Sequence, residues 1–230
     1  MAKLNVLGLL ENHALFHNIT AIELSELQKE VGKIDLAKGL TLFRKGDIAE
    51  HTYIVVFGLI KLSIPSPQGN DKVLELIRPG QSFGEAMMFL DEPYPFHAEA
   101  LESTLLLKIP RKALLQLLDR SPAISRQMMA GLSFRLLGFI RNVERYSLQN
   151  ASQRVIDYLL QTSAMQSTNE VRLELKKHLV ASLLNLTPET LSRVLHQLRD
   201  ENLIKVCGST IHIGSADALK SYQQNVPALH

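Results

Sequence analysis

The pattern of apolar and polar positions is most informative in residues 173–213. Two short helical patterns flank a tight turn at residues 185–187, and two β-like runs, 204–207 and 210–213, follow them. Within each helical pattern the apolar residues recur at intervals that give the helix one buried face. They are Leu179, Val180, Leu183 and Leu184 in the first helix and Leu191, Val194, Leu195 and Leu198 in the second. The pattern predicts a helix-turn-helix followed by a β-hairpin wing.

The second of these helices begins with two signals of its own. The Thr187 hydroxyl can accept an unpaired backbone N–H of the first turn, so Thr187 is the expected N-cap. Pro188 then occupies the first helical position, where its missing N–H leaves no hydrogen bond unmade.

Residues 32–110 have a different pattern from the helical segments, because short β-like runs recur there with turn residues between them. Such runs predict an antiparallel sandwich or barrel, and a small barrel encloses packed side chains or one small ligand. Before it, residues 1–31 read as helical, with Thr20 and Glu23 at the spacing of a capping box. The β-like runs are 34–37, 41–43, 53–57, 59–64, 72–77, 99–101 and 104–109.

A long helical pattern opens at Ser121-Pro122 and continues to about residue 150. Apolar residues recur in it at alternating intervals of three and four, which is typical of a coiled-coil seam. The alternative is a helix packed on its own domain, but the regular spacing in a linking helix favours a parallel homodimer. The seam residues are Met129, Leu132, Leu136, Phe139, Val143 and Tyr146.

The predicted fold class is α+β, with three parts. Residues 1–120 form an N-terminal β-barrel sensor, residues 121–150 a dimerisation helix and residues 151–230 the winged helix-turn-helix. The last part begins with a further helical pattern over residues 151–164.

Composition and charge exclude several classes of protein. The net charge is only +2, so any basic surface must be local. The single cysteine, Cys207, excludes an intrachain disulfide, and its role is open. The longest apolar run, 53–60, is far shorter than the ~20 residues of a membrane helix, and no signal peptide is evident. A cytoplasmic protein is expected.

The eight histidines are scattered, and neither a metal-ligand spacing nor a nucleophile motif stands out. We therefore expect no enzyme, with a metal-dependent barrel enzyme as the alternative. His13 and His17 are four residues apart, so on a helix they would share a face. Such a pair can bind a metal, although it more often lies at an ordinary surface.

The order of these parts resembles the Crp/Fnr superfamily of bacterial transcription regulators. Residues 53–62 look like its strand–Gly–strand hairpin, and Phe83-Gly84-Glu85 looks like the start of its ligand cassette. Residues 187–193, followed by Leu203-Ile204, look like its recognition helix and wing. The resemblance implies a homodimeric, sequence-specific regulator with a small effector and contacts to RNA polymerase. Residues 85–91 are similar to the Dnr-like branch, which implies nitric-oxide responses through haem.

A recognition helix reads base edges in the major groove from its N-terminal residues. Arg193 can offer its planar fork to guanine, Glu189 can accept from cytosine, and Ser192 allows close approach. The alternative is a Glu–Arg surface pair. The three residues resemble those of the Fnr branch of the superfamily, which implies TTGAT-like half-sites in an inverted repeat. Pro188 departs from many relatives, in which this position can itself contact DNA. Candidate phosphate contacts are Lys176, Lys177, Thr190, His196 and Arg199.

The candidate effector pocket lies in the same cassette. In cyclic-nucleotide binders of the family, Gly-Glu is followed by an Arg that neutralises the phosphate, then Ser or Thr and Ala. Here Gly84 and Glu85 are present, but Phe96, His97 and Ala98 stand in the later positions. Because this loop supplies no cation for a phosphate, cAMP binding is not expected. A cAMP-responsive Crp-like activator remains the alternative.

The same loop is apolar, which suits a flat ligand such as haem. Its lining is expected to come from Met87, Met88, Phe89 and Phe96 together with His97, although packed core is the alternative. His13, His17 and His97 are the candidate axial ligands. An unknown small ligand, or a sensor that has lost its ligand, stays open. An iron–sulfur cluster is excluded because the cysteines that it needs are absent.

Overall fold

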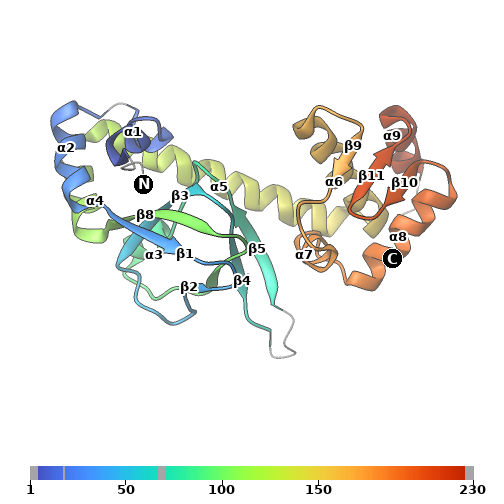
Figure 1. Ribbon diagram of the computed structural model, residues 1–230, viewed down its shortest axis with the longest axis horizontal. Coiled ribbons are helices and arrows are strands. Elements are labelled where there is room, and N and C mark those ends of the chain that lie inside the picture. Colours follow the sequence, from blue (N-terminus) through green and yellow to red (C-terminus); the bar gives the residue numbers. More distant parts are fainter. Residues whose placement is uncertain (1–4, 18, 67–70, 226–230) are drawn as a thin grey trace. The chain divides into compact units, whose positions relative to one another are not determined.

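The computed structural model describes residues 5–17, 19–66 and 71–225. Its contacts divide the chain into two compact units, Met1–Leu136 and Leu137–His230. The long helix α5 (Pro122–Leu148) contributes residues to both (Figure 1). The division therefore falls inside the predicted dimerisation helix, residues 121–150. Each unit is described by itself.

The first unit begins with α1 (Val6–Glu11), the short 3-10 helix η1 (Ala14–Phe16) and α2 (Ala21–Glu30). The predicted capping box is present. The Glu23 N–H donates to the Thr20 hydroxyl at 3.3 Å, and the Thr20 N–H donates to the Glu23 carboxylate at 2.9 Å. The expectation that His13 and His17 share one helical face is wrong, because they flank η1 as its N-cap and C-cap.

Two antiparallel four-stranded sheets follow, as predicted for a small sandwich or flattened barrel. Their strand orders are β1-β8-β3-β6 and β2-β7-β4-β5. At the turn between β3 and β4, Gly58 has φ +90, and a Cβ there would lie 2.6 Å from the Ser103 carbonyl. The strands are β1 (Gly32–Leu36), β2 (Thr41–Phe43), β3 (His51–Phe57), β4 (Ile60–Ile64), β5 (Lys72–Ile77), β6 (Ser82–Phe83), β7 (His97–Ala100) and β8 (Thr104–Pro110).

Two hydrophobic clusters hold this unit together. One lies between the sheets and includes Phe43, Leu62 and Leu106. The other packs the N-terminal helices and α4 (Arg111–Arg120) against residues of β3 and β8. The short helix α3 (Glu85–Leu90), which the sequence did not predict, lies after β6 and contributes to both clusters.

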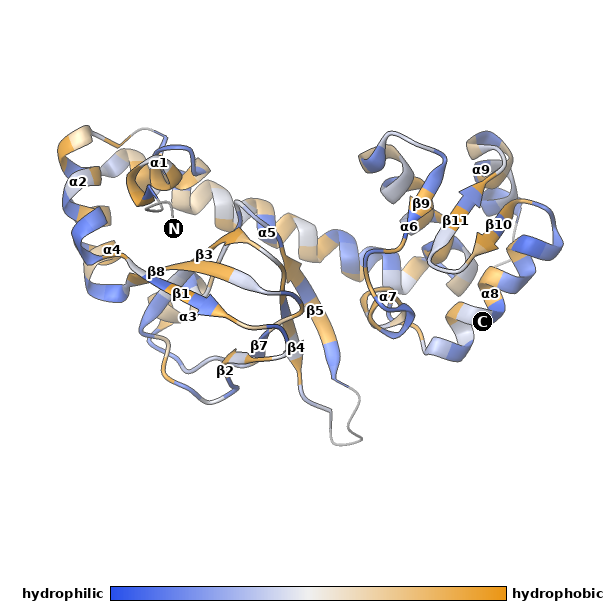
Figure 2. Cartoon of the chain, viewed as in Figure 1, coloured by the Kyte–Doolittle hydropathy of each residue, from blue (hydrophilic) through white to orange (hydrophobic). Residues whose placement is uncertain are grey.

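The second unit contains the predicted winged helix-turn-helix. Its sheet has the strand order β10-β11-β9, and hydrophobic and hydrophilic residues share the surface of α8 (Figure 2). The described part of this unit ends in α9, which the sequence did not predict. The elements are α6 (Ala151–Gln166), β9 (Glu170–Arg172), α7 (Lys177–Leu183), α8 (Pro188–Asp200), β10 (Ile204–Cys207), β11 (Thr210–Ile213) and α9 (Ala216–Asn225).

One core supports this unit. It gathers residues of α6, α7, α8, the three strands and α9. All four apolar residues predicted for α8 are buried in it, whereas Leu179 and Leu183 of α7 are only half-buried. Among the residues that the structure describes, no helix combines the length and apolar character needed to cross a membrane.

Candidate DNA-reading helix and effector site

The N-terminus of α8 is built as its sequence predicts. The Thr187 hydroxyl accepts the Thr190 N–H at 3.2 Å, and Pro188 occupies the first turn. The apolar face of α8 is buried, so its opposite face is held toward solvent. Glu189, Ser192 and Arg193 lie on that exposed face.

Within the described residues, Arg193 makes no hydrogen bond and no ion pair, so the alternative Glu–Arg surface pair is not formed. The guanidinium fork is therefore free to contact another molecule. Hydrogen bonds from its own backbone and from the Thr187 side chain hold the pKa of Glu189 below its usual value, which keeps this carboxylate an acceptor.

The candidate phosphate contacts lie on α7 and α8. Lys176 is the N-cap of α7 and Lys177 its first residue, and both are exposed. His196 is also exposed, whereas the Thr190 hydroxyl lies 3.1 Å from that of Thr187. Arg199 differs from Arg193, because its guanidinium is engaged by the Asp200 carboxylate at 2.9 Å.

The candidate effector site of the first unit centres on Glu85, which is 3% exposed. Its Oε1 lies 2.7 Å from Arg135 Nη1 of α5 and accepts the Ser82 hydroxyl at 3.4 Å. Its Oε2 is buried and has no hydrogen-bond partner among the described residues. Arg135 also donates to the Ser82 carbonyl at 2.5 Å, and its Nε lies 3.7 Å from Glu75 Oε1. The site therefore does contain a cation, but it is Arg135 of α5 and not a residue of the loop that follows Gly84.

Five aromatic rings fill the space between the two sheets. Phe43 stacks on Tyr94 with 3.6 Å between ring centroids, Tyr53 lies 5.3 Å from Phe83, and Phe96 lies 6.0 Å from Phe43. The Tyr94 hydroxyl donates to the His51 carbonyl at 2.9 Å. Burial raises the pKa of Tyr53 and of Tyr94, so both hydroxyls stay protonated. The interior is apolar, as expected, but closely packed.

The structure separates the residues predicted to line the effector pocket. Gly84 and Glu85 are buried, and Met87 and Phe96 pack against the cluster between the sheets. Three others do not join them. Met88 is buried in the cluster under the N-terminal helices, and Phe89 is exposed, because successive residues of α3 point in different directions. His97 alternates with the buried Ala98 on β7, so it lies on the opposite face of that sheet.

The three candidate axial histidines differ in their hydrogen bonds. His13 is buried, and its Nδ1 accepts the Leu15 N–H at 3.3 Å. The Nδ1 of His97 accepts the Lys45 N–H at 2.9 Å. An iron ligand that binds through Nε2 carries its proton on Nδ1, where each of these histidines already faces a donor. His17 is exposed, and neither ring nitrogen has a hydrogen bond among the described residues.

The seam residues of α5 are mostly uncovered within one chain. Met129, Leu136, Phe139 and Val143 are between 43% and 64% exposed. Leu132 is half-buried, and the Tyr146 hydroxyl donates to the Leu183 carbonyl at 2.8 Å. A stripe of large exposed apolar side chains on one helix is typical of an interface.

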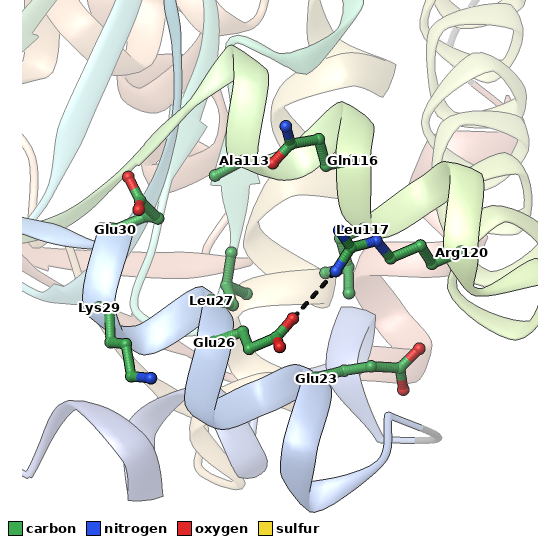
Figure 3. A pocket seen from close by; sticks show the side chains of 9 residues that line it. All are labelled: Glu23, Glu26, Leu27, Lys29, Glu30, Ala113, Gln116, Leu117 and Arg120. Atoms are coloured by element: carbon green, nitrogen blue, oxygen red, sulfur yellow. Dashed lines mark hydrogen bonds and ion pairs between the residues drawn. The ribbon is translucent and has the colours of Figure 1, made fainter.

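A hollow of about 290 Å³ lies away from the barrel interior, between α2 and α4 (Figure 3). Leu27 and Leu117 contribute its apolar wall, and an ion pair of 3.0 Å between Glu26 and Arg120 spans it (Figure 3). None of the predicted site residues lines it.

Glu75 and Arg135 were not among the predicted site residues, since nothing in the local sequence joins positions on β5 and α5. The pairing of Tyr53 with Phe83 could not be predicted either, because burial on β3 does not alternate and the two-residue strand β6 gives no local pattern.

Comparisons with known protein families match both units. The model of the cyclic nucleotide-binding domain matches residues 33–121. The model of the Crp-like helix-turn-helix domain matches residues 153–222. Both matches agree with the order of the parts along the chain.

Three relatives illustrate the similarity. The transcriptional activator protein Anr of Pseudomonas protegens is 30% identical, over 77% of this chain and 75% of its own length. The cyclic AMP receptor protein of Thermus thermophilus is 28% identical, over 90% of this chain and 94% of its own. The crystal structure of DNR from Pseudomonas aeruginosa is 35% identical with a TM-score of 0.51, over 94% of this chain and 96% of that one.

Proposed function

This chain belongs to the Crp/Fnr family of transcription regulators, and on that premise we propose that it reads a TTGAT-like inverted repeat as a homodimer and responds to an effector other than cAMP. The observation that carries the proposal is the exposed, unpaired Arg193 on α8, beside Glu189 and Ser192. The buried face of α8 leaves this trio exposed on the other side of the helix, in its N-terminal half. In a recognition helix the N-terminal residues read the bases in the major groove.

Each member of the trio has a distinct role in base reading. The Arg193 fork donates to O6 and N7 of guanine, and the Glu189 carboxylate accepts from N4 of cytosine. Ser192 adds little bulk beside Arg193, so the helix can approach the bases closely. Lys176, Lys177, Thr190 and His196 hold the backbone of the DNA. Arg199 contributes less to phosphate binding, because its guanidinium is paired with the Asp200 carboxylate.

The test is the affinity of Arg193→Ala for a TTGAT inverted repeat and for a repeat with the guanine replaced. We expect a loss of about 1–3 kcal/mol on the intact repeat and little difference between the two sequences. Arg199→Ala is the matched control, and it should keep the discrimination. Equal binding by wild type and Arg193→Ala would contradict the assigned role of α8.

The homodimer rests on the exposed apolar seam of α5. Two recognition helices about 34 Å apart are needed to read both half-sites of an inverted repeat. Phe139→Glu places a charge in the seam and should yield monomers in sedimentation. Phe134→Glu is the matched control, since Phe134 is 75% exposed but projects from the opposite side of α5. A dimer that survives Phe139→Glu would rule out this seam.

The effector is proposed to differ from cAMP because Arg135, the cation at the site, already binds Glu85 and the Ser82 carbonyl. A ligand that takes Glu85 away from Arg135 acts on α5 directly. It shifts the protein only through its different affinities for the two arrangements of this helix. Contacts with RNA polymerase are part of the proposal, by analogy with the family.

We favour haem with nitric oxide as the effector system, with His17 as the axial ligand. His17 fits better than His13 or His97, whose Nδ1 atoms accept backbone N–H groups. A bound haem would supply an iron that takes up nitric oxide, and His17 would hold that iron through a ring nitrogen.

An optical titration with haem, and then with nitric oxide, tests this proposal, and cAMP serves as the control ligand. A stoichiometric Soret band that is lost in His17→Ala but kept in His97→Ala would support it. The absence of specific uptake would leave an unknown ligand. Saturable cAMP binding would instead favour a cAMP-responsive activator, in line with the relative from Thermus thermophilus that is named as a cyclic AMP receptor protein.

A further inference from the structure

Three charged side chains from distant parts of the sequence meet in the effector site. They are Glu75 on β5, Glu85 on α3 and Arg135 on α5. Arg135 lies 2.7 Å from Glu85 Oε1 and 3.7 Å from Glu75 Oε1. Two carboxylates therefore share one guanidinium, which leaves the group with one net negative charge when both are ionised.

The strand register turns Glu75 toward this site. Glu75 lies directly opposite Leu62 of β4, which is buried in the cluster between the sheets. Residues directly opposite each other in an antiparallel pair project from the same face. Burial raises the pKa of Glu75, and the neighbouring Glu85 charge adds to that rise, whereas Arg135 opposes it. Glu75 thus stands in a partly desolvated, negatively charged setting.

The hydrogen-bonding atoms at the site that lack partners favour one kind of ligand. Glu85 Oε2 is buried without a partner among the described residues, so it lacks a hydrogen-bond donor. The Arg135 guanidinium, in contrast, already faces Glu85, Glu75 and the Ser82 carbonyl. A donor that reaches the site therefore finds an acceptor without a partner, whereas an anion finds the guanidinium already paired and a second carboxylate beside it.

We propose that Glu75 is a specificity-determining residue of the effector site. Its carboxylate, beside the pair of Glu85 and Arg135, repels anionic ligands and thereby selects neutral or cationic ligands that donate a hydrogen bond to Glu85. The proposal deepens the proposed function, because it takes the effector site of that function as its premise. It concerns the part of an effector that reaches Glu85, so anionic groups of a larger ligand must lie elsewhere.

The test compares two probes that differ in charge, cAMP as the anion and adenosine as its uncharged counterpart. Binding to the full-length protein is measured for wild type, Glu75→Gln and Glu75→Ala. Glu75→Asp keeps the charge, and Glu102→Gln removes an exposed carboxylate elsewhere in the same unit. We expect both neutral variants to bind cAMP at least about tenfold more tightly than wild type, as for loss of one partly screened charge–charge repulsion. Adenosine binding should change less than about twofold, and the two control variants should behave as wild type.

Several outcomes would overturn the proposal. If folded Glu75→Gln and Glu75→Ala bind cAMP no better than wild type does, Glu75 does not exclude anions. The same conclusion holds if neither wild type nor any variant binds cAMP. An equal gain in Glu75→Asp would show that its charge is not the cause. Tight cAMP binding by wild type would refute both this inference and the proposed effector. Recognition of the DNA repeat, tested separately through Arg193, would be untouched by any of these results.

Discussion

The ion pair between Arg135 and Glu85 leads to the most demanding prediction. Arg135→Met removes the cation and leaves Glu85, which is 3% exposed, without a charged partner. Breaking a buried pair in this way costs about 3–5 kcal/mol. The Arg135 side chain is 26% exposed, so water compensates in part, and we expect a loss near the lower end, about 3 kcal/mol.

Urea unfolding of the full-length protein, followed by circular dichroism, measures this loss. Glu85→Gln combined with Arg135→Met should be less destabilised than the sum of the single variants, because the buried charge is then gone as well. Arg141→Met is the matched control, since Arg141 is an exposed arginine of the same helix with no ion pair among the described residues. A loss below about 1 kcal/mol, or equal to that of Arg141→Met, would refute the reasoning.

Two further predictions concern the stability of the first unit. Burial lowers the pKa of His13 from 6.5 to about 4, so stability that is present above pH 6.5 should be lost as the pH falls toward 4. This pKa difference corresponds to about 3 kcal/mol of unfolding free energy. The stability of His13→Gln should therefore depend less on pH between pH 6.5 and 4 than that of wild type does. Parallel curves of stability against pH for the two proteins would contradict this prediction. Gly58→Ala should destabilise the unit by about 3 kcal/mol in thermal melts, since its Cβ would lie 2.6 Å from the Ser103 carbonyl at a φ of +90. A melt like that of wild type would show that the β3–β4 turn adapts without strain.

Elements with strong local patterns were predictable from the sequence. The N-cap Thr187, the apolar face of α8 and the wing strands all follow from spacing within a few residues, and the structure contains them. The strands of the barrel followed from β-like runs separated by turn residues, except for β6, which the sequence did not predict. The exposed trio on α8 was predictable too, because a helix with one buried face must present the other.

The charged site of the barrel depended on tertiary structure. Glu75, Glu85 and Arg135 are far apart in the sequence, and only the packing of β5, α3 and α5 brings one guanidinium between two carboxylates. The loop itself supplies no cation, as its sequence predicts, but Arg135 of α5 reaches the site. The hydrogen bonds of His13 and His97 also depend on three-dimensional neighbours. Local propensity specifies helices, strands and caps, whereas burial and charge pairing depend on long-range contacts that no local pattern encodes.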